Sequence, residues 1–354
     1  MKVILKKMPL YEAFDFDSDE VENFDAIIEF HHHKKFLKSN YKIVGEISYY
    51  KKDGILFIDI DGSIKIKNKN LTSLTNGQFC FGKVKRNFDC SDCKFLKTLE
   101  GAPEKVGGNF DCRYCDSLTS LKGAPSNIGG DFNCSYCKSL ISLEGGPIEV
   151  GNSFGCRNCD SLKSIEGSPS KVKKNFDCTG CKSLSSLKGA PTEVSVFSCG
   201  SCDSLTSLKG SPNKIKGNFD CSDCVSLTSL EGAPTEVGGY FNCTHCDSLT
   251  SLRGAPSKVG RDFCCEYCDS LTSLRGAPSK VGGNFHINNC ESLKSLEGAP
   301  SKVGGNFRCH DCKALTSLKG APNKVGGYFY CYRCDSLKTI DLPVTTSIGG
   351  IISK

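Results

Sequence analysis

Apolar residues recur at fixed offsets along most of the chain, within a unit that reads F-x-C-x-x-C-x-S-L-x-S-L-x-G-A-P-x-x-V-G-G-x. Successive units are 22 residues apart, except that Phe176 and Phe197 are separated by 21. Apolar positions repeated at such a period predict a solenoid, in which each unit buries its apolar side against the next. The phenylalanine of the unit occurs at Phe88, Phe110, Phe132, Phe154, Phe176, Phe197, Phe219, Phe241, Phe263, Phe285, Phe307 and Phe329.

The alternation of polar and apolar residues inside the unit predicts how each unit folds. Phe241 and Cys243 flank the polar Asn242, which is the period-two pattern of a short strand with both flanking side chains in the core. The segment Gly254-Ala255-Pro256 predicts a turn and prevents a helix from continuing. We therefore expect parallel strands about 4.8 Å apart, joined by extended return segments rather than by helices.

The pattern divides the chain into three parts. Residues 1–62 lack the repeat and predict a small α+β cap, because a solenoid needs its open ends covered. Residues 63–342 predict the β-rich solenoid of about twelve units, and residues 343–354 predict a half-repeat that closes the C-terminal end. The apolar residues Ile340 and Ile351 are expected to take part in that closure.

The cap is predicted to contain one helix and one hairpin. Eight acidic residues and no basic residue lie between Glu12 and Glu29. Ser18 is a suitable helix cap, so we expect a helix from Ser18 to about Lys38. Two β-branched and aromatic stretches around the turn Lys51-Lys52-Asp53-Gly54 predict a hairpin over residues 41–60.

The composition adds 25 cysteines, of which all but two occupy the two cysteine positions of the unit. Three interpretations are open: buried thiols that fill a narrow core, C-x-x-C zinc sites, or disulfides. Ile287 replaces the first cysteine in one intact unit, and isoleucine can replace a core thiol but cannot ligate zinc. We therefore favour buried thiols and expect no metal or other cofactor. Cys264 lies outside the pattern at an outward strand position and is the candidate for an exposed, reactive thiol.

Charge and motif content narrow the class of function. The net charge is +6 and no run of 18 apolar residues occurs, which predicts a protein that does not span a membrane. No export signal accompanies the cysteines, so we expect a reducing compartment. Neither a Ser/His/Asp or Cys/His arrangement nor a phosphate loop stands out from the repeats, so we expect no enzyme activity.

Lysines recur at the P-x-K-V position of the unit, for example at Lys258 and Lys280. A row of lysines at the repeat spacing is a candidate for tracking phosphates. We place this row on the face opposite the aromatic residues and interpret it as ordinary surface solvation. Without a groove that combines stacking and positive charge, we expect no nucleic acid partner.

The outward positions beside each strand vary from unit to unit, and in a solenoid these positions face the partner. The middle of the chain carries small residues there, whereas the later units carry tyrosine, histidine and arginine. Tyrosine and arginine dominate the energetic hot spots of protein interfaces. The candidate partner-binding residues are Tyr240, Tyr267, Arg308, His310, Tyr328, Tyr330, Tyr332 and Arg333.

The repeat resembles a known family. F-x-C-x-x-C is similar to the leucine-rich-repeat strand motif L-x-L-x-x-N/C, and residues 249–256 resemble the convex side of the short bacterial class. Phenylalanine and cysteine replace the strand leucines, and cysteine replaces the asparagine of the family's ladder. The wording of the unit also resembles uncharacterised repeat proteins of bacteria and tailed bacteriophages. The resemblance implies a leucine-rich-repeat arc that serves as a protein-binding scaffold.

These observations lead to three functional hypotheses. The first is a non-enzymatic protein-binding scaffold, phage-encoded, that engages a host protein through its sheet face. The second is a structural or virion-associated repeat protein, and the third is a metal-binding cysteine-rich protein. For the first we expect a cytoplasmic location in the producing or host cell, and for the second a place in the virion.

Overall fold

The computed structural model describes residues 24–75, 77, 79–342 and 347–352, which fold as a parallel β-solenoid with one helix near its start. This confirms the predicted fold class. The chain forms two compact units: unit 1 comprises Met1–Cys159 and Gly167–Lys173, and unit 2 comprises Asp160–Glu166 and Lys174–Lys354. Within the described ranges, no helix is both long enough and apolar enough to cross a membrane.

Unit 1 begins with the predicted helix and hairpin. α1 (Phe24–Asn40) leads directly into β1 (Tyr41–Lys52), which pairs antiparallel with β2 (Ile55–Ile66). The hairpin turn lies at Asp53 and Gly54, both of which have a positive φ. β2 continues across residue 62 without a break and supplies the first rung of the coil stack.

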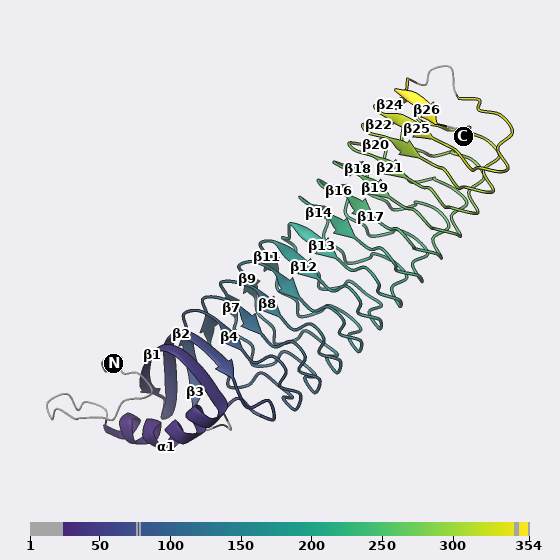
Figure 1. Cartoon of the computed structure of the whole chain (residues 1–354). Helices are drawn as coiled ribbons and strands as arrows, with labels where there is room; N and C mark the ends of the chain where they lie inside the picture. The colour runs from purple at the N-terminus through teal and green to yellow at the C-terminus, as the bar shows by residue number, and fades with distance from the viewer. Residues whose placement is uncertain (1–23, 76, 78, 343–346, 353–354) are drawn as a thin grey trace. The chain divides into compact units, whose positions relative to one another are not determined.

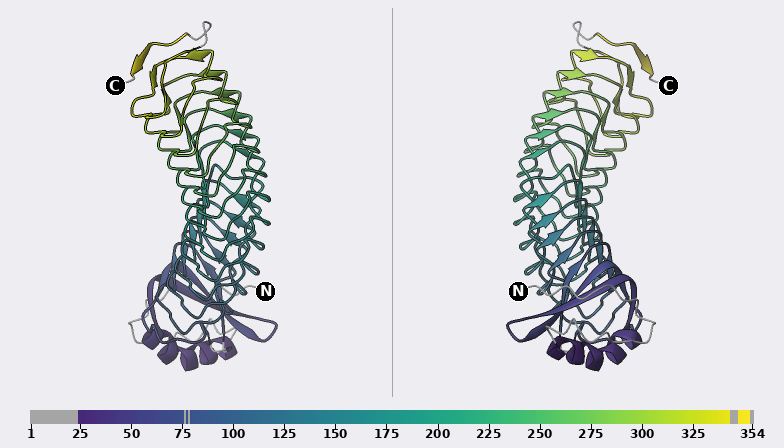
Figure 2. Two further views of the ribbon diagram at one scale, coloured as in Figure 1. Left: turned by 90° about the vertical axis from the view of Figure 1, so that its right-hand side faces the viewer. Right: turned by 90° about the vertical axis from the view of Figure 1, so that its left-hand side faces the viewer.

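The helix covers the N-terminal end of the coils of unit 1 (Figure 2). Leu37 of the helix is buried, and the ring of Phe36, also in the helix, meets the ring of Phe79 edge-on with 6.1 Å between centroids. The helix therefore shields the apolar interior of the first coil from water, as a solenoid cap must. Ser18, the expected start of this helix, lies outside the described residues.

Each coil of unit 1 contributes two short parallel strands, one at the Lys-Val positions and one at the phenylalanine. The sequence pattern predicts only the second of these. One ladder runs β3–β5–β7–β9–β11 and the other β2–β4–β6–β8–β10. The strands are β3 (Cys80–Val84), β4 (Phe88–Asp89), β5 (Lys105–Val106), β6 (Phe110–Asp111), β7 (Asn127–Ile128), β8 (Phe132–Asn133), β9 (Glu149–Val150), β10 (Phe154–Gly155) and β11 (Lys171–Val172).

Unit 2 repeats the same two ladders, as Figure 1 shows for its green and yellow coils. We call them the Lys-Val ladder, β14–β16–β18–β20–β22–β24, and the Phe ladder, β12–β13–β15–β17–β19–β21–β23–β25–β26. The strands are β12 (Asn175–Asp177), β13 (Val196–Ser198), β14 (Lys214–Ile215), β15 (Phe219–Asp220), β16 (Glu236–Val237), β17 (Phe241–Asn242), β18 (Lys258–Val259), β19 (Phe263–Cys264), β20 (Lys280–Val281), β21 (Phe285–His286), β22 (Lys302–Val303), β23 (Phe307–Arg308), β24 (Lys324–Val325), β25 (Tyr328–Tyr330) and β26 (Gly350–Ile352).

In unit 1 the two ladders belong to one sheet, whereas in unit 2 the Lys-Val ladder forms a separate sheet of six strands. In unit 1 the single strand β2 pairs with β3 through residues 57–60 and with β4 through Ile64 and Lys65. A Gly-Gly bend alone links the two strands of most coils, and a Cβ on Gly282 would lie 2.1 Å from the carbonyl oxygen of Gly260. The lysines therefore lie on strands that are separated by one short bend from the strands that carry the aromatic residues.

The phenylalanine rings form stacked columns in the core, as predicted. Phe88 and Phe110 of unit 1 stack with 5.1 Å between centroids, and Phe219 and Phe241 of unit 2 with 5.4 Å. These rings are fully buried. Phe176 and Phe197 also pair in register, so the unit of 21 residues keeps its place in the Phe ladder.

The cysteines form a second column of contacts between coils, which consists of thiol hydrogen bonds. All 25 are free thiols, and every cysteine on the repeat pattern is buried. The second cysteine of a coil donates its S–H to the backbone carbonyl of the first cysteine position of the preceding coil. The sulfur–oxygen distance is 3.3 Å from Cys246 to Cys221 and 3.2 Å from Cys312 to Ile287. The acceptor is a main-chain oxygen, so isoleucine at position 287 leaves the bond intact.

The last coil is incomplete at its far side. β26 pairs parallel with β25 and places Ile351 beside Phe329. Ile340 and Ile351 are each 43% exposed, whereas Leu296 at the position equivalent to Ile340 two coils earlier is fully buried. The described residues of the half-repeat thus extend the sheet by one strand without covering the core beneath it.

The two cysteine positions are expected to differ in their tolerance of substitution. Cys243→Val should change the free energy of unfolding by less than about 1 kcal/mol, because valine fills the same core space. The thiol of Cys243 also donates to the carbonyl of Cys264 at 3.3 Å, but that carbonyl still accepts the backbone N–H of Cys243 at 2.8 Å. Cys246→Val should lower it by about 1–3 kcal/mol, because the buried carbonyl of Cys221 loses its donor. Chemical denaturation followed by circular dichroism measures both. Equal costs for the two variants would contradict the assigned role of the thiol bond.

Alkaline pH is expected to destabilise the fold. Burial is the largest cause that raises the pKa of Cys93 and of Cys312 to about 12, whereas a thiol in an unfolded chain has a pKa of about 8.5. The unfolded state therefore releases these protons first as pH rises. Stability is complete below about pH 8.5 and is lost progressively toward pH 12, by up to about 1.4 kcal/mol per pH unit for each such thiol. Denaturation midpoints from pH 7 to 11 under reducing conditions test this, and a flat profile would contradict it.

Candidate partner-binding surface

The residue that follows the core phenylalanine has a structural role in six of the twelve described coils. We count positions from the phenylalanine, so that +1 follows it and −1 precedes it. At +1, an aspartate or asparagine accepts a hydrogen bond from the backbone N–H two residues later. The distances are 3.0 Å for Asp220 with Ser222 and 3.1 Å for Asn242 with Thr244. This Asx turn holds the bend after the strand and explains the preference for these residues at +1.

Four consecutive coils near the C-terminus abandon that Asx turn. Their +1 residues are Cys264, His286, Arg308 and Tyr330, which lie in register on neighbouring strands of the Phe ladder. None of these side chains carries the short carbonyl or carboxylate that makes an Asx turn. We call these residues the +1 column. The chain here replaces a local stabilising bond with large outward side chains.

Two buried nitrogen atoms within the +1 column have no hydrogen-bond partner among the described residues. They are Nε of Arg308 and Nδ1 of His286. The guanidinium carbon of Arg308 lies 5.3 Å from the ring centroid of Tyr330, within range of a cation–π interaction. Burial lowers the pKa of His286; Glu266, 3.4 Å away, opposes this shift and Arg308 adds to it. His286 is therefore neutral near pH 7. The buried, unpaired Nε–H of Arg308 carries a free-energy cost of about 1–3 kcal/mol.

The neighbouring +3 and +4 positions of the last two coils form a rigid polar and aromatic cluster. His310 and Tyr332 stack with 4.4 Å between ring centroids and an interplanar angle of 4°. Nδ1 of His310 lies 2.8 Å from Oδ2 of Asp311, whose Oδ1 lies 3.2 Å from Nε of Arg333. These contacts fix the side chains in place before any partner arrives, which reduces the entropy lost on binding.

Tyr328, at −1 of the last full coil, completes this surface. Its side chain is 50% exposed, and its ring centroid lies 6.2 Å from that of Tyr330. Six of the eight residues predicted from the sequence are thus brought together on two adjacent coils. We call them the C-terminal cluster: Arg308, His310, Tyr328, Tyr330, Tyr332 and Arg333.

The other two predicted residues lie apart from the C-terminal cluster. Tyr240 occupies −1 four coils before Tyr328, which corresponds to about 19 Å along the ladder, and it is half-buried. Tyr267 is 45% exposed at +4 and stacks on His245 with 4.5 Å between centroids. The structure therefore assigns neither residue to the same contact area.

Position +4 has a backbone constraint that the sequence does not reveal. Every non-glycine residue there has a positive φ, from 52° to 63°, including Tyr267 and Arg333. Bulky residues rarely adopt this left-handed conformation, and no glycine pattern signals it. The bend places these side chains outward, as the stacked pair Tyr114 and Tyr136 in unit 1 also shows with 4.7 Å between centroids.

The expectation that Cys264 is an exposed, reactive thiol is wrong. Its side chain lies in the +1 column and is only partly accessible. Burial, with the nearby carboxylates of Glu266 and Asp262, raises its pKa to about 12. Since the thiolate is the nucleophile, this thiol is unreactive at neutral pH.

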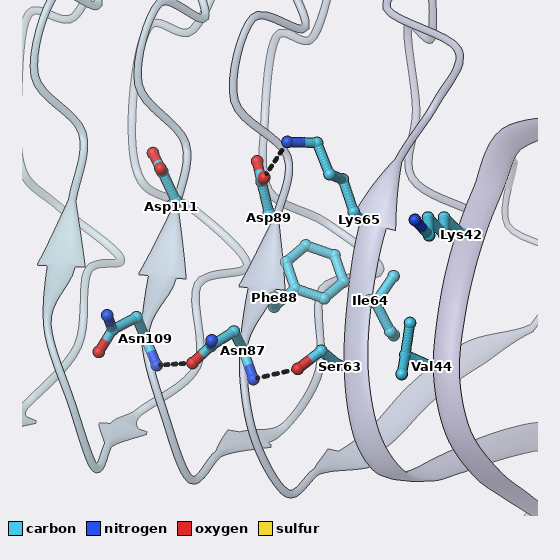
Figure 3. A pocket seen from close by; sticks show the side chains of 10 residues that line it. All are labelled: Lys42, Val44, Ser63, Ile64, Lys65, Asn87, Phe88, Asp89, Asn109 and Asp111. Atoms are coloured by element: carbon cyan, nitrogen blue, oxygen red, sulfur yellow. Dashed lines mark hydrogen bonds and ion pairs between the residues drawn. The ribbon is translucent and has the colours of Figure 1, made fainter.

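Unit 1 has a shallow hollow of about 380 Å³ where the hairpin meets the first coils (Figure 3). Its charged lining is already paired, since Nζ of Lys65 lies 2.9 Å from Oδ2 of Asp89. At its floor, the side chain of Asn87 accepts a hydrogen bond from the backbone N–H of Asn109 at 2.9 Å. These groups serve the stacking of coils, so the hollow offers weaker grounds for a binding site than the C-terminal cluster.

Comparison with known proteins adds little to this picture. No family model matches the chain, and no curated protein sequence matches it. Among solved structures, the chain is similar to a leucine-rich repeat protein from Bacteroides ovatus. The two share 14% sequence identity over 88% of this chain and 100% of that one, with a TM-score of 0.34. The description of the fold therefore rests on the coils themselves, whose 22-residue period and parallel strands are those that the leucine-rich-repeat resemblance implies.

Restoring an Asx turn in the +1 column is expected to stabilise the protein. Arg308→Asn removes the buried unpaired Nε and supplies a side-chain oxygen for the backbone N–H of His310. The free energy of unfolding should rise by about 0.5–1.5 kcal/mol. The reverse change in a coil that has the turn, Asn242→Ala, should lower it by a similar amount. Loss of stability in Arg308→Asn would show that the arginine serves packing instead.

Proposed function

We propose that this chain is a non-enzymatic protein-binding scaffold whose binding site is the C-terminal cluster. The observation that carries the proposal is the exchange of Asx turns for His286, Arg308 and Tyr330 in successive coils. An exchange that sacrifices local stability, and leaves two buried nitrogen atoms unpaired, is typical of a functional site rather than of a solvated surface.

The chemistry of the C-terminal cluster supports a protein as the partner. Tyrosine and arginine provide large contact areas with few rotatable bonds, and both are enriched at interface hot spots. The unpaired Nε of Arg308 offers a donor to a carbonyl or carboxylate of the partner. The small outward residues of the middle coils, such as Ser198 and Gly200, offer no comparable anchor.

The resemblance to bacterial and phage repeat proteins suggests the setting of this interaction. We propose that the chain is phage-encoded and acts in the host cytoplasm on a host protein. A structural role in the virion is the alternative, and it predicts many copies of the chain in purified particles.

A capture experiment tests the proposed site. The tagged chain and a Tyr328→Ala/Tyr330→Ala/Tyr332→Ala variant are incubated with host lysate under reducing conditions, and bound proteins are identified by mass spectrometry. We expect a partner that wild type retains and the variant loses by at least about tenfold, as for removal of hot-spot tyrosines.

The matched control replaces three tyrosines outside the C-terminal cluster, Tyr114, Tyr136 and Tyr267, by alanine. This variant should retain the partner, and thermal melts should show that both variants remain folded. A partner that is indifferent to the cluster variant would contradict the site, and the absence of any partner would favour the structural role.

A further inference from the structure

A second feature of the same coils is a row of four lysines on the Lys-Val ladder. Lys258, Lys280, Lys302 and Lys324 face one another in direct parallel register. We call them the lysine row. Neighbouring members are separated by one strand spacing of about 4.8 Å, so the row spans about 14 Å. Like charges directly opposite one another on adjacent strands destabilise a sheet.

The lysine row is exposed and carries no compensating charge. None of its four members forms an ion pair with any residue in the described part of the chain. On the strand before the row, Glu236 forms an ion pair with Lys214 at 3.5 Å. The row begins on the next strand, with Lys258. Serine precedes and glycine follows the Lys-Val pair in most of these coils. The carboxylate next to the row on this ladder is that of Glu236, which is in register with Lys258 and pairs with Lys214.

In another charged row of the same solenoid, lysines form ion pairs with glutamates, so the two rows can be compared within one protein. At the position before the Gly-Ala-Pro turn, lysine and glutamate pair between adjacent coils. We call this the paired row: Lys122 with Glu100 at 2.9 Å, Lys188 with Glu166 at 2.6 Å, Lys209 with Glu231 at 3.4 Å and Lys319 with Glu297 at 2.7 Å. The repeat thus readily accommodates alternating charge, and the lysine row departs from that arrangement only in the last coils.

The lysine row adjoins the proposed protein-binding site. Lys324 precedes Tyr328 by four residues, and a Gly-Gly bend links their strands β24 and β25. Figure 1 shows these two strands next to each other near the C-terminal end of unit 2. A partner bound to the C-terminal cluster could therefore also contact the lysine row.

We propose that the lysine row binds an acidic segment of the protein partner, an inference that rests on the proposed function and specifies the chemistry of that partner. A single line of four positive charges complements an extended chain of carboxylates. Charge complementarity of this kind guides encounter and orientation.

One observation favours an acidic protein over a nucleic acid. The aromatic faces next to the lysine row are already occupied, since Tyr332 stacks on His310 and Tyr330 lies against Arg308. Bases therefore find few free stacking platforms, which single-strand binding requires.

The experiment measures binding of fluorescently labelled poly-L-glutamate and of oligo(dT) to the full chain at low and at physiological salt. The test variant is Lys258→Gln/Lys280→Gln/Lys302→Gln/Lys324→Gln. The matched control is Lys122→Gln/Lys188→Gln/Lys209→Gln/Lys319→Gln, which removes the same formal charge from the paired row.

We expect wild type to bind polyglutamate in preference to oligo(dT). The lysine-row variant should bind polyglutamate at least about tenfold more weakly, and the control less than about twofold. The melting temperature of the lysine-row variant should be unchanged or higher, because like-charge repulsion is removed. This last measurement excludes misfolding as the cause of lost binding.

Three results would overturn the inference: no binding of polyglutamate by wild type, equal loss in both variants, or tighter binding of oligo(dT) that depends on the lysine row. Each is separable from the proposed function. If capture of a partner depends on Tyr328, Tyr330 and Tyr332 while polyglutamate fails to bind, the protein-binding role stands and the acidic partner falls. If polyglutamate binding depends on the lysine row but no captured protein depends on those tyrosines, the lysine row binds acidic chains and the proposed protein-binding site is wrong.

Discussion

The bend after each strand buries a backbone carbonyl, and the fold depends on satisfying that carbonyl between coils. The thiol of the following coil does so at a sulfur–oxygen distance of 3.1–3.4 Å, as from Cys334 to Cys309 and from Cys202 to Cys178. Cysteine suits the position because it is small, tolerates full burial and still carries a donor. The stacked phenylalanines contribute apolar burial, while the thiol bonds fix how each coil sits on the previous one. The stability of the protein is thereby tied to a reducing environment, because oxidation removes the donor.

The sequence alone predicts those parts of the fold that one unit repeats faithfully. The inward positions of Phe241 and Cys243, the hairpin and the parallel stacking all follow from the period and the alternation of polarity. The Lys-Val ladder was not predictable, because two-residue strands have no pattern of their own and form only when neighbouring coils stand in register.

The C-terminal cluster was partly predictable, because large residues replaced small ones at outward positions. The differences in sequence between units could not show which replacements remove the hydrogen bond of an Asx turn. The Asx turn at Asn242 is visible only in the structure. Arg308 occupies the position of such a turn, whereas Tyr240 occupies a position where no such turn forms. The left-handed backbone at Tyr267 and Arg333 was equally hidden, since no glycine marks it.

The near-identity of the contacts between coils bears on how such a chain changes over generations. Phe176 and Phe197 remain in register although their unit is one residue short, so the Phe ladder does not depend on the length of the bend before it. The Lys-Val ladder, in contrast, has no strand at residues 193–194 of that unit. Each coil presents to the next almost the same surface that it receives from the one before. Recombination between repeats in the gene can therefore add or remove whole coils while preserving every remaining interface. The length of the protein is in this sense freely adjustable, whereas the specialised coils near its C-terminus are not interchangeable with the rest.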